Sequence, residues 1–234
     1  MTGEDSGTGG GREPISKNTR NLIGTFTYHR ITHVIDIGAN VGQYAQRLRR
    51  GGFDGHIVSI EPNPAVHPAL ADAAADDPNW TLWPPVALGD AKGTLTLNRP
   101  AASDMASALP LTDVMAGYLD DANPVDQVDV PVKRLDALFD QLVPADARVA
   151  VKSDTQGYEA AVLSGADRVL SRITVLQIEL SLIPVYSGAV EWRAMIDRLS
   201  GLGFEPILFI PGYFHKRTGR LIEMDGVFAR RDTL

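Results

Sequence analysis

The 234-residue chain contains no cysteine. Disulfides, thiolate nucleophiles and zinc sites with sulfur ligands are therefore excluded. Long apolar runs are missing too, since no stretch approaches the roughly 20 apolar residues that a membrane-spanning helix needs. The first residues also lack the charged segment followed by an apolar one that marks a secretory signal. These absences predict a cytoplasmic protein without a transmembrane segment.

Positive charge is in short supply. The 22 lysines and arginines are outnumbered by 29 acidic residues, which gives a formal net charge of −7. An acidic chain is a poor non-specific binder of polyanions, so we expect no nucleic-acid partner. The five histidines are scattered and form no metal-ligand motif. The hydrophobic share of 44% is that of a globular protein with a sizeable core.

The residue pattern divides the chain into a polar N-terminal segment and one region with the periodicity of a folded domain. Residues 1–13 are glycine-rich and polar, which predicts a disordered tail. Residues 14–234 are expected to form a single domain, beginning with a helix over 16–28. Apolar strands then alternate with helices, including predicted strands over 32–38, 56–62, 148–154 and 173–180 and predicted helices over 41–52, 64–77 and 156–172.

This alternation predicts a mainly parallel, doubly wound sheet with helices on both faces. The last two apolar segments are joined by GYFHKRTG at 212–219, which is too short for a helical crossover. The final strand should therefore run antiparallel to its neighbour. Residues 100–127 have no clear periodicity, and we interpret them as an excursion over the mouth of an active site.

The stretch VIDIGANVG at 34–42 ends the first strand of this domain. Gly38 and Gly42 permit a tight turn and a close approach of ligand to backbone. The helix that follows would offer free N–H groups and a positive dipole end. Glu61 ends the next strand, where an acid can accept hydrogen bonds from both hydroxyls of a ribose. Together these features predict an adenosine-bearing cofactor; the alternative is a purely structural turn beside a solvated acid.

Two adenosine-bearing cofactors, a nicotinamide dinucleotide and S-adenosylmethionine, fit the residues of this turn to different degrees. The dinucleotide fingerprint requires further glycines where this chain has Asn40 and Gln43, so a nicotinamide-dependent oxidoreductase is the weaker alternative. Asp36, two residues before the first glycine, would face a positively charged part of the ligand. S-adenosylmethionine carries such a part in its ammonium group beside the sulfonium. A non-catalytic binding protein with the same fold is the remaining alternative.

The sequence resembles the FkbM family of S-adenosylmethionine-dependent methyltransferases. The resemblance is carried by VIDIGANVGQY, VSIEPNP, VALGDAKGTLTL, VPVKRLDALF and VAVKSDTQGYEAAVLSGA, and it extends over about 31–231. It implies a class I methyltransferase, a Rossmann-like α/β fold with a seven-stranded sheet whose last strand is reversed. It also implies O-methylation of a hydroxyl on a sugar, glycolipid or polyketide-type natural product. Together with the net charge of −7, the resemblance favours a neutral, hydroxyl-bearing acceptor over a nucleic acid. Ser153 stands where the family pattern has an aliphatic strand residue.

The resemblance and the chemistry together assign cofactor-binding residues at the ends of the first strands. The expected set is Asp36, Gly38, Asn40 and Gly42 for the methionine end, Glu61 for the ribose, and Pro62 with Val86 or Ala87 for the adenine, with core packing as the alternative for the last three.

Acidic residues later in the chain are the candidates for catalysis. Asp154 is the first candidate for the general base that takes the acceptor's proton, with Glu179 beside it. Together with Glu159 they could hold a magnesium-like ion through oxygen ligands. Alternatively, Asp154 caps the predicted helix and Glu159 complements its N-terminal dipole. The sequence leaves the metal requirement and the oligomeric state open.

Overall fold

The computed structural model describes residues 15–100, 106–116, 118 and 124–234. The predicted tail at 1–13 and part of the excursion at 100–127 lie outside these residues. A seven-stranded sheet forms the centre, in the order β3-β2-β1-β7-β8-β12-β9. Its strands are β1 (His33–Ile37), β2 (His56–Ile60), β3 (Trp80–Leu82), β7 (Val149–Ser153), β8 (Ile173–Ser181), β9 (Phe204–Pro211) and β12 (Glu223–Arg230).

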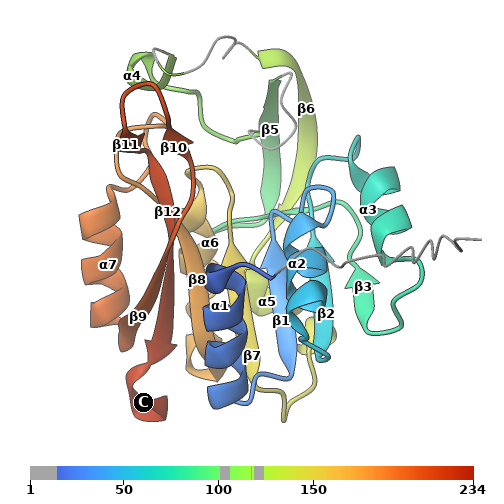
Figure 1. Cartoon of the computed structure of the whole chain (residues 1–234). Helices are drawn as coiled ribbons and strands as arrows, with labels where there is room; N and C mark the ends of the chain where they lie inside the picture. The colour runs from blue at the N-terminus through green and yellow to red at the C-terminus, as the bar shows by residue number, and fades with distance from the viewer. Residues whose placement is uncertain (1–14, 101–105, 117, 119–123) are drawn as a thin grey trace, which may run out of the picture.

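Strand directions in this sheet follow the prediction. β1 pairs in parallel with β2 and β7, β2 with β3, and β7 with β8. β12 inserts between β8 and β9 and runs antiparallel to both. The reversed last strand is therefore confirmed, and the fold is that of a class I methyltransferase. Because β1, β2 and β7 are parallel, their carboxyl ends meet at one edge, the upper one in Figure 1.

Helices cover both faces of the sheet, as the doubly wound interpretation requires (Figure 1). Two separate apolar clusters, one on each face, hold these layers together. The first face carries α1 (Lys17–Tyr28), α2 (Gln43–Gly51) and α3 (His67–Ala74), and the second carries α5 (Leu135–Leu142), α6 (Glu159–Ser164) and α7 (Trp192–Gly201). Neighbouring side chains of a strand point to opposite faces of the sheet. Val34 therefore packs in the cluster on the first face, and Ile35 packs in the cluster on the second.

A second, three-stranded sheet stands above the carboxyl-terminal edge of the first (Figure 1). It consists of β4 (Ala87–Leu88), β5 (Gly93–Pro100) and β6 (Pro124–Lys133), with β6 antiparallel to β5. β6 begins inside the segment predicted to be irregular, which also contains the short helix α4 (Asp113–Ala116). The connection at 212–219 holds most of a small hairpin, β10 (Phe214–His215) with β11 (Arg220–Leu221).

The helix predicted over 156–172 is wrong in its length. Gln156 and Gly157 have φ angles of 56° and 95°, so the chain makes a left-handed turn where the helix was expected to begin. α6 ends at Ser164 because Gly165 packs against the backbone of Gly89; a Cβ there would lie 2.0 Å from the Gly89 carbonyl oxygen. A 3-10 turn, η2 (Leu170–Arg172), follows before β8, and another, η3 (Arg231–Thr233), follows β12. Within the described residues, no helix is both long and apolar enough to cross a membrane.

Candidate active site

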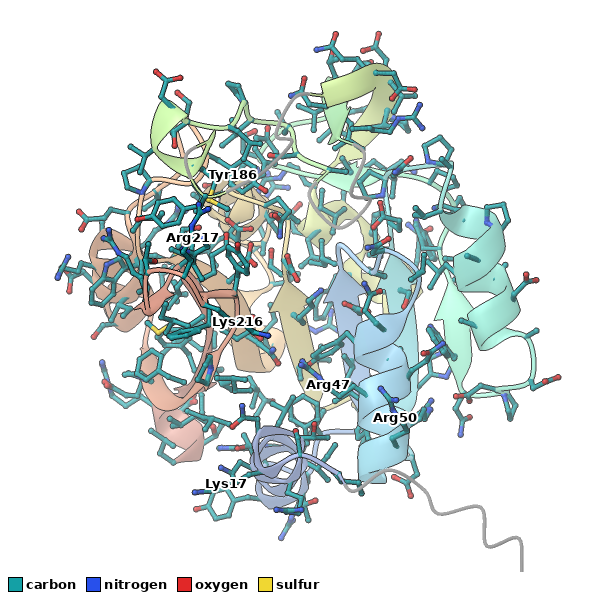
Figure 2. The ribbon with its side chains drawn as sticks, turned by 45° about the horizontal axis from the view of Figure 1, so that its top comes forward. Lys17, Arg47, Arg50, Tyr186, Lys216 and Arg217 are labelled. Atoms are coloured by element: carbon teal, nitrogen blue, oxygen red, sulfur yellow. The ribbon has the colours of Figure 1, made fainter. Side chains whose placement is uncertain are left out.

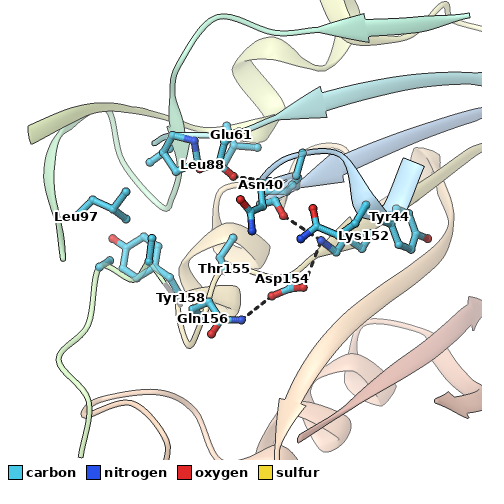
Figure 3. A pocket seen from close by; sticks show the side chains of 18 of the residues that line it. Asn40, Tyr44, Glu61, Leu88, Leu97, Lys152, Asp154, Thr155, Gln156 and Tyr158 are labelled. Carbon is cyan, nitrogen blue, oxygen red and sulfur yellow. Dashed lines mark hydrogen bonds and ion pairs between the residues drawn. The ribbon is translucent and has the colours of Figure 1, made fainter. Parts of the chain in front are cut away.

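A cavity of about 370 Å³ lies at the carboxyl-terminal edge of the central sheet, where β1, β2 and β7 end. This volume is typical of small-molecule sites. Figure 3 shows it between the ends of the strands and the second sheet. Seven of the predicted site residues line it: Gly38, Asn40, Glu61, Pro62, Val86, Ala87 and Asp154. Asp36, Gly42 and Glu179 do not line it, although each contacts or supports a residue that does.

The loop after β1 turns in a way that only glycine tolerates at its first position. Gly38 has a φ of 76°, and a Cβ on it would lie 1.8 Å from the backbone oxygen of Asp154. The ends of β1 and β7 therefore touch through this glycine. Gly42 has a φ of 87° and faces Trp80, whose ring atoms would lie 2.7 Å from an added Cβ. Gly42 thus lets α2 begin close to β3, and its effect on the cavity is to set the position of this helix.

Glu61 closes the cavity at the end of β2. Its two carboxylate oxygens accept hydrogen bonds of 2.8 Å from the backbone N–H groups of Asn40 and Asn63. Burial raises the pKa of Glu61, while these two N–H donors lower it. Each oxygen keeps a second acceptor direction, because a carboxylate oxygen can take two hydrogen bonds. The acid predicted to bind a ribose is therefore fixed in orientation and borders the cavity.

Apolar side chains form the opposite wall. Pro62 follows Glu61 directly, while Val86, Ala87 and Leu88 come from the segment at β4. Leu95 and Leu97 of β5 complete this wall, so the second sheet contributes directly to the cavity. Val86, Ala87 and Leu88 are also packed into the apolar clusters, which means that the site role and the core-packing alternative coexist.

Behind the cavity lies a buried ion network that sequence reasoning foresaw only in part. Asp36 and Lys152 are register partners on β1 and β7. The Lys152 Nζ atom lies 3.2 Å from Asp36 Oδ1 and 3.4 Å from Asp154 Oδ2, and it donates to the Gly38 carbonyl at 3.1 Å. Asp36 has no exposed surface, so the structure places its carboxylate against Lys152 and not in the cavity. Burial alone would lower the pKa of Lys152, but Asp154 and Asp36 raise it, so the ammonium stays charged.

The turn between β7 and α6 holds the candidate base. Asp154 Oδ1 accepts a 2.8 Å hydrogen bond from the side-chain amide of Gln156, and the same amide donates to Glu179 Oε2 at 3.0 Å. The helix-cap alternative for Asp154 is wrong, because α6 begins at Glu159 and Tyr158 is its N-cap residue. Burial and the charge of Asp154 raise the pKa of Glu179 well above its ordinary value.

Glu159 is the first residue of α6 and has a structural role in the turn that precedes this helix. Its Oε1 atom accepts hydrogen bonds from the backbone N–H groups of Thr155, at 2.8 Å, and Gly157, at 3.2 Å. Glu159 therefore holds the turn in shape and does not converge with Asp154 and Glu179 on one point. Among the described residues, no group of three or more His, Asp or Glu side chains is placed to hold an ion, so the expectation of a magnesium ion gains no support.

Several cavity residues were not predicted. Tyr44, Arg47 and Arg50 line the cavity from α2, and Asp225 lines it from β12. The three residues on α2 repeat at helical spacing, three apart, and this periodicity was the one signal in the sequence that could have found them. Asp225 had no such signal, since β12 reaches the site only because it inserts beside β8.

Comparisons with known proteins identify the family of this chain. The profile described as "Methyltransferase FkbM domain" matches residues 36–206. No curated protein sequence matches the chain. Among solved structures, a Thermobifida fusca YX protein described as a methyltransferase is similar, with 12% identity over 92% of this chain and 79% of the other and a TM-score of 0.51.

Two further solved structures are similar at lower TM-scores. Fibrillarin from Aeropyrum pernix, with natively bound S-adenosyl-L-methionine, shares 13% identity over 91% of this chain and 76% of the other at a TM-score of 0.47. The mitomycin 7-O-methyltransferase MmcR shares 10% sequence identity over 91% of this chain and 53% of the other, at a TM-score of 0.46. The profile match spans well over half of the sequence, and the chain therefore belongs to the FkbM family of S-adenosylmethionine-dependent methyltransferases.

Proposed function

We propose that the protein is an O-methyltransferase whose acceptor is a hydroxyl of a sugar, glycolipid or polyketide-type natural product. The observation that carries this proposal is that Glu61 and Asp154 border one cavity with the Gly38–Asn40 backbone between them. This arrangement offers a ribose acceptor and a proton acceptor on one small-molecule site. We also infer that residues 14–234 act as one methyltransferase domain.

The residues present suit the cofactor. Asn40 Oδ1 is buried and has no hydrogen-bond partner among the described residues, so it can accept from a bound ligand. Glu61 would bind the ribose hydroxyls, and Pro62 with Ala87 would enclose the adenine. Gly38 and Asn40 would hold the methionine end. Asp36 would support it from behind by fixing Lys152, and Gly42 by placing α2. S-adenosylmethionine, when bound, supplies an activated methyl group.

Asp154 is the proposed general base. Its side chain is 33% exposed and lines the cavity, so an acceptor hydroxyl can reach it. The Lys152 Nζ atom lies 3.4 Å from its Oδ2 atom and holds the carboxylate in place. A sugar hydroxyl is a weak acid, and its proton must leave as the new oxygen–carbon bond forms. Glu179 would assist by holding the Gln156 amide, which orients Asp154.

Cofactor binding is the first test. Calorimetry should show that S-adenosylhomocysteine binds and that Glu61→Gln weakens it roughly tenfold or more, because a charged hydrogen-bond acceptor is lost. Glu191→Gln is the matched control, since Glu191 lies at the start of α7 outside the cavity and is 65% exposed. Tight binding of NAD without any binding of S-adenosylhomocysteine would refute the proposal.

The acceptor class is the second test. Methyl groups from radiolabelled cofactor should appear on hydroxyls of a glycolipid or polyketide-containing extract, and nuclease treatment should not remove the label. Transfer mainly to RNA or to a protein nitrogen would contradict O-methylation of a small molecule. No transfer to any extract, with cofactor binding intact, would favour the non-catalytic binding protein.

A further inference from the structure

Two arginines of α2, Arg47 and Arg50, line the cavity. Arg47 and Arg50 form no ion pair and no side-chain hydrogen bond with any residue that the structure describes. Arg49, on the same helix, provides the contrast. It pairs with Asp77 at 2.6 Å and donates to three backbone carbonyls, those of Phe53, Gly55 and Asn79. Arg49 is a structural arginine, whereas Arg47 and Arg50 have their donors free.

Arg47 is held in place although its donors are free. Its Nε atom is buried and has no hydrogen-bond partner among the described residues. The guanidinium lies 5.1 Å from the ring centroid of Tyr44, whose hydroxyl donates to Gln177 at 2.8 Å. Gln177 in turn donates to Asp225 at 3.0 Å. A fixed guanidinium with unused donors is arranged for a ligand, because ordering it costs nothing further at binding.

The acids that line the same cavity are already engaged. Glu61 accepts from two backbone N–H groups, Asp154 from Gln156, and Asp225 from Gln177. Burial and the charge of Asp154 raise the pKa of Asp225, while Lys152 and Arg47 oppose this shift. No carboxylate oxygen of a described residue lies within 4.0 Å of the Arg47 nitrogens. The cavity therefore presents two guanidinium groups, those of Arg47 and Arg50, that no carboxylate of a described residue contacts.

Further cations lie on the same face of the molecule. Figure 2 shows Arg47 and Arg50 together with Lys17 of α1 and with Lys216 and Arg217 of the β10–β11 turn. Lys17, Lys216 and Arg217 are exposed, and within the described part of the chain they too form no ion pair. On a protein with a net charge of −7, this concentration of cations on one face favours an anionic ligand.

We propose that the acceptor carries a phosphoryl group, which binds to Arg47 and Arg50 while a neighbouring hydroxyl is presented to Asp154. This inference rests on the proposed function and narrows its substrate class. Two arginines three residues apart present two planar donor forks on one side of a helix. One carboxylate is satisfied by a single fork, whereas a phosphoryl group has three oxygens and up to two charges to share between both. The phosphoryl group could belong to a soluble sugar phosphate or to a lipid headgroup.

The test is calorimetric titration of inorganic pyrophosphate into the protein saturated with S-adenosylhomocysteine. Saturation matters because the methionine carboxylate of the cofactor is the competing use for these arginines. Binding is expected, and Arg50→Gln and Arg47→Gln should each weaken it by roughly tenfold or more while leaving the affinity for S-adenosylhomocysteine within about twofold. Arg50 is exposed, so its variant folds even where that of Arg47 does not.

Arg30→Gln is the matched control. Arg30 is an exposed cation that follows α1 and precedes β1, at the edge of the sheet opposite the cavity. An equal loss of pyrophosphate binding in Arg30→Gln would show unspecific attraction and overturn the proposal. Loss of S-adenosylhomocysteine affinity in the Arg47 and Arg50 variants, without pyrophosphate binding, would assign the arginines to the cofactor instead. If S-adenosylhomocysteine fails to bind, the proposed function fails, and pyrophosphate binding to the free protein still decides the anion site.

Two further titrations separate the sources of the phosphoryl group. A nucleoside diphosphate sugar represents the soluble source, and phosphatidylcholine vesicles with or without phosphatidic acid represent the lipid source. Binding of either that is weakened by Arg50→Gln supports the site and identifies its source. Binding of neither overturns the proposal.

Discussion

Replacing Lys152 with methionine tests the network behind the cavity. Methionine keeps a long flexible side chain but removes the charge that lies 3.2 Å from Asp36 and 3.4 Å from Asp154. The Lys152 side chain is 6% exposed and that of Asp36 is not exposed at all, so water cannot replace the lost partner. Asp154, at 33%, can be solvated and adds little. The variant therefore leaves one uncompensated buried carboxylate.

Removing one partner of a buried ion pair costs about 3–5 kcal/mol. We expect Lys152→Met to lower the free energy of unfolding by about that amount, which is a large part of the roughly 5–15 kcal/mol that a domain possesses. Urea unfolding followed by circular dichroism measures this change. The double variant Lys152→Met/Asp36→Asn should recover part of it, because a neutral buried amide costs only about 1–3 kcal/mol. Lys133→Met, an exposed lysine on β6, is the control and should change stability by less than about 0.5 kcal/mol.

The stability that Lys152→Met loses should also depend on pH. Burial raises the pKa of Asp36, and the charge of Lys152 opposes this, so the single variant raises that pKa further. A carboxyl whose folded pKa lies above its unfolded one stabilises at low pH and loses this contribution as pH rises through the folded value. The free energy of unfolding of Lys152→Met should therefore lie closer to that of the wild type at pH 5 than at pH 8. These pH values are about one unit and about four units above the unfolded pKa of an aspartate. A loss below about 1 kcal/mol, or no recovery in the double variant, would refute the buried ion network.

Three other predictions follow from single positions. Gly38→Ala should abolish binding of S-adenosylhomocysteine in calorimetry, because the added Cβ meets the Asp154 backbone. Gly52→Ala is the control: its φ is 94° but the space around it is open, so the variant should lose only about 1–2 kcal/mol of stability. Asp154→Asn should lower turnover about 10²–10⁴-fold with cofactor affinity retained, and near-normal turnover would exclude the base role. Burial raises the pKa of Glu223 to about 7, so wild-type stability should fall between the unfolded glutamate pKa and pH 7. Glu223→Gln should make this slope shallower in urea titrations, while the raised pKa values of Asp36 and Glu179 keep the rest of it.

Local signals in the sequence were enough for most of the sheet. The strand that precedes Gly38 and the one that precedes Glu61 are short apolar runs bounded by turn residues, and both form where predicted. The reversed last strand followed from the length of one connection. These features depend on residues close together in the chain, where periodicity and turn chemistry act directly.

The features that were missed depend on residues far apart in the chain. Asp36 faces Lys152 because β1 and β7 are neighbours in a particular register, which no local pattern specifies. α6 stops at Ser164 because Gly165 meets the backbone of Gly89, a contact between distant segments. The three-stranded sheet forms because β6 pairs with both β4 and β5, and part of it lies in a segment with little periodicity.

The distribution of charge shows why a whole-chain value misleads about a single site. The net charge of −7 favoured a neutral acceptor, yet Arg47, Arg50 and Lys152 all line the cavity. Screening limits the reach of an exposed charge to about 8 Å at physiological ionic strength, so distant surface acids have little influence on a ligand inside. The acids Glu61, Asp154 and Asp225 also line the cavity, but none of their oxygens lies within 4.0 Å of an Arg47 or Arg50 nitrogen. An acidic protein can therefore repel long polyanions and still bind one phosphoryl group. Rising salt should weaken the contact of the exposed Arg50 more than that of the half-buried Arg47.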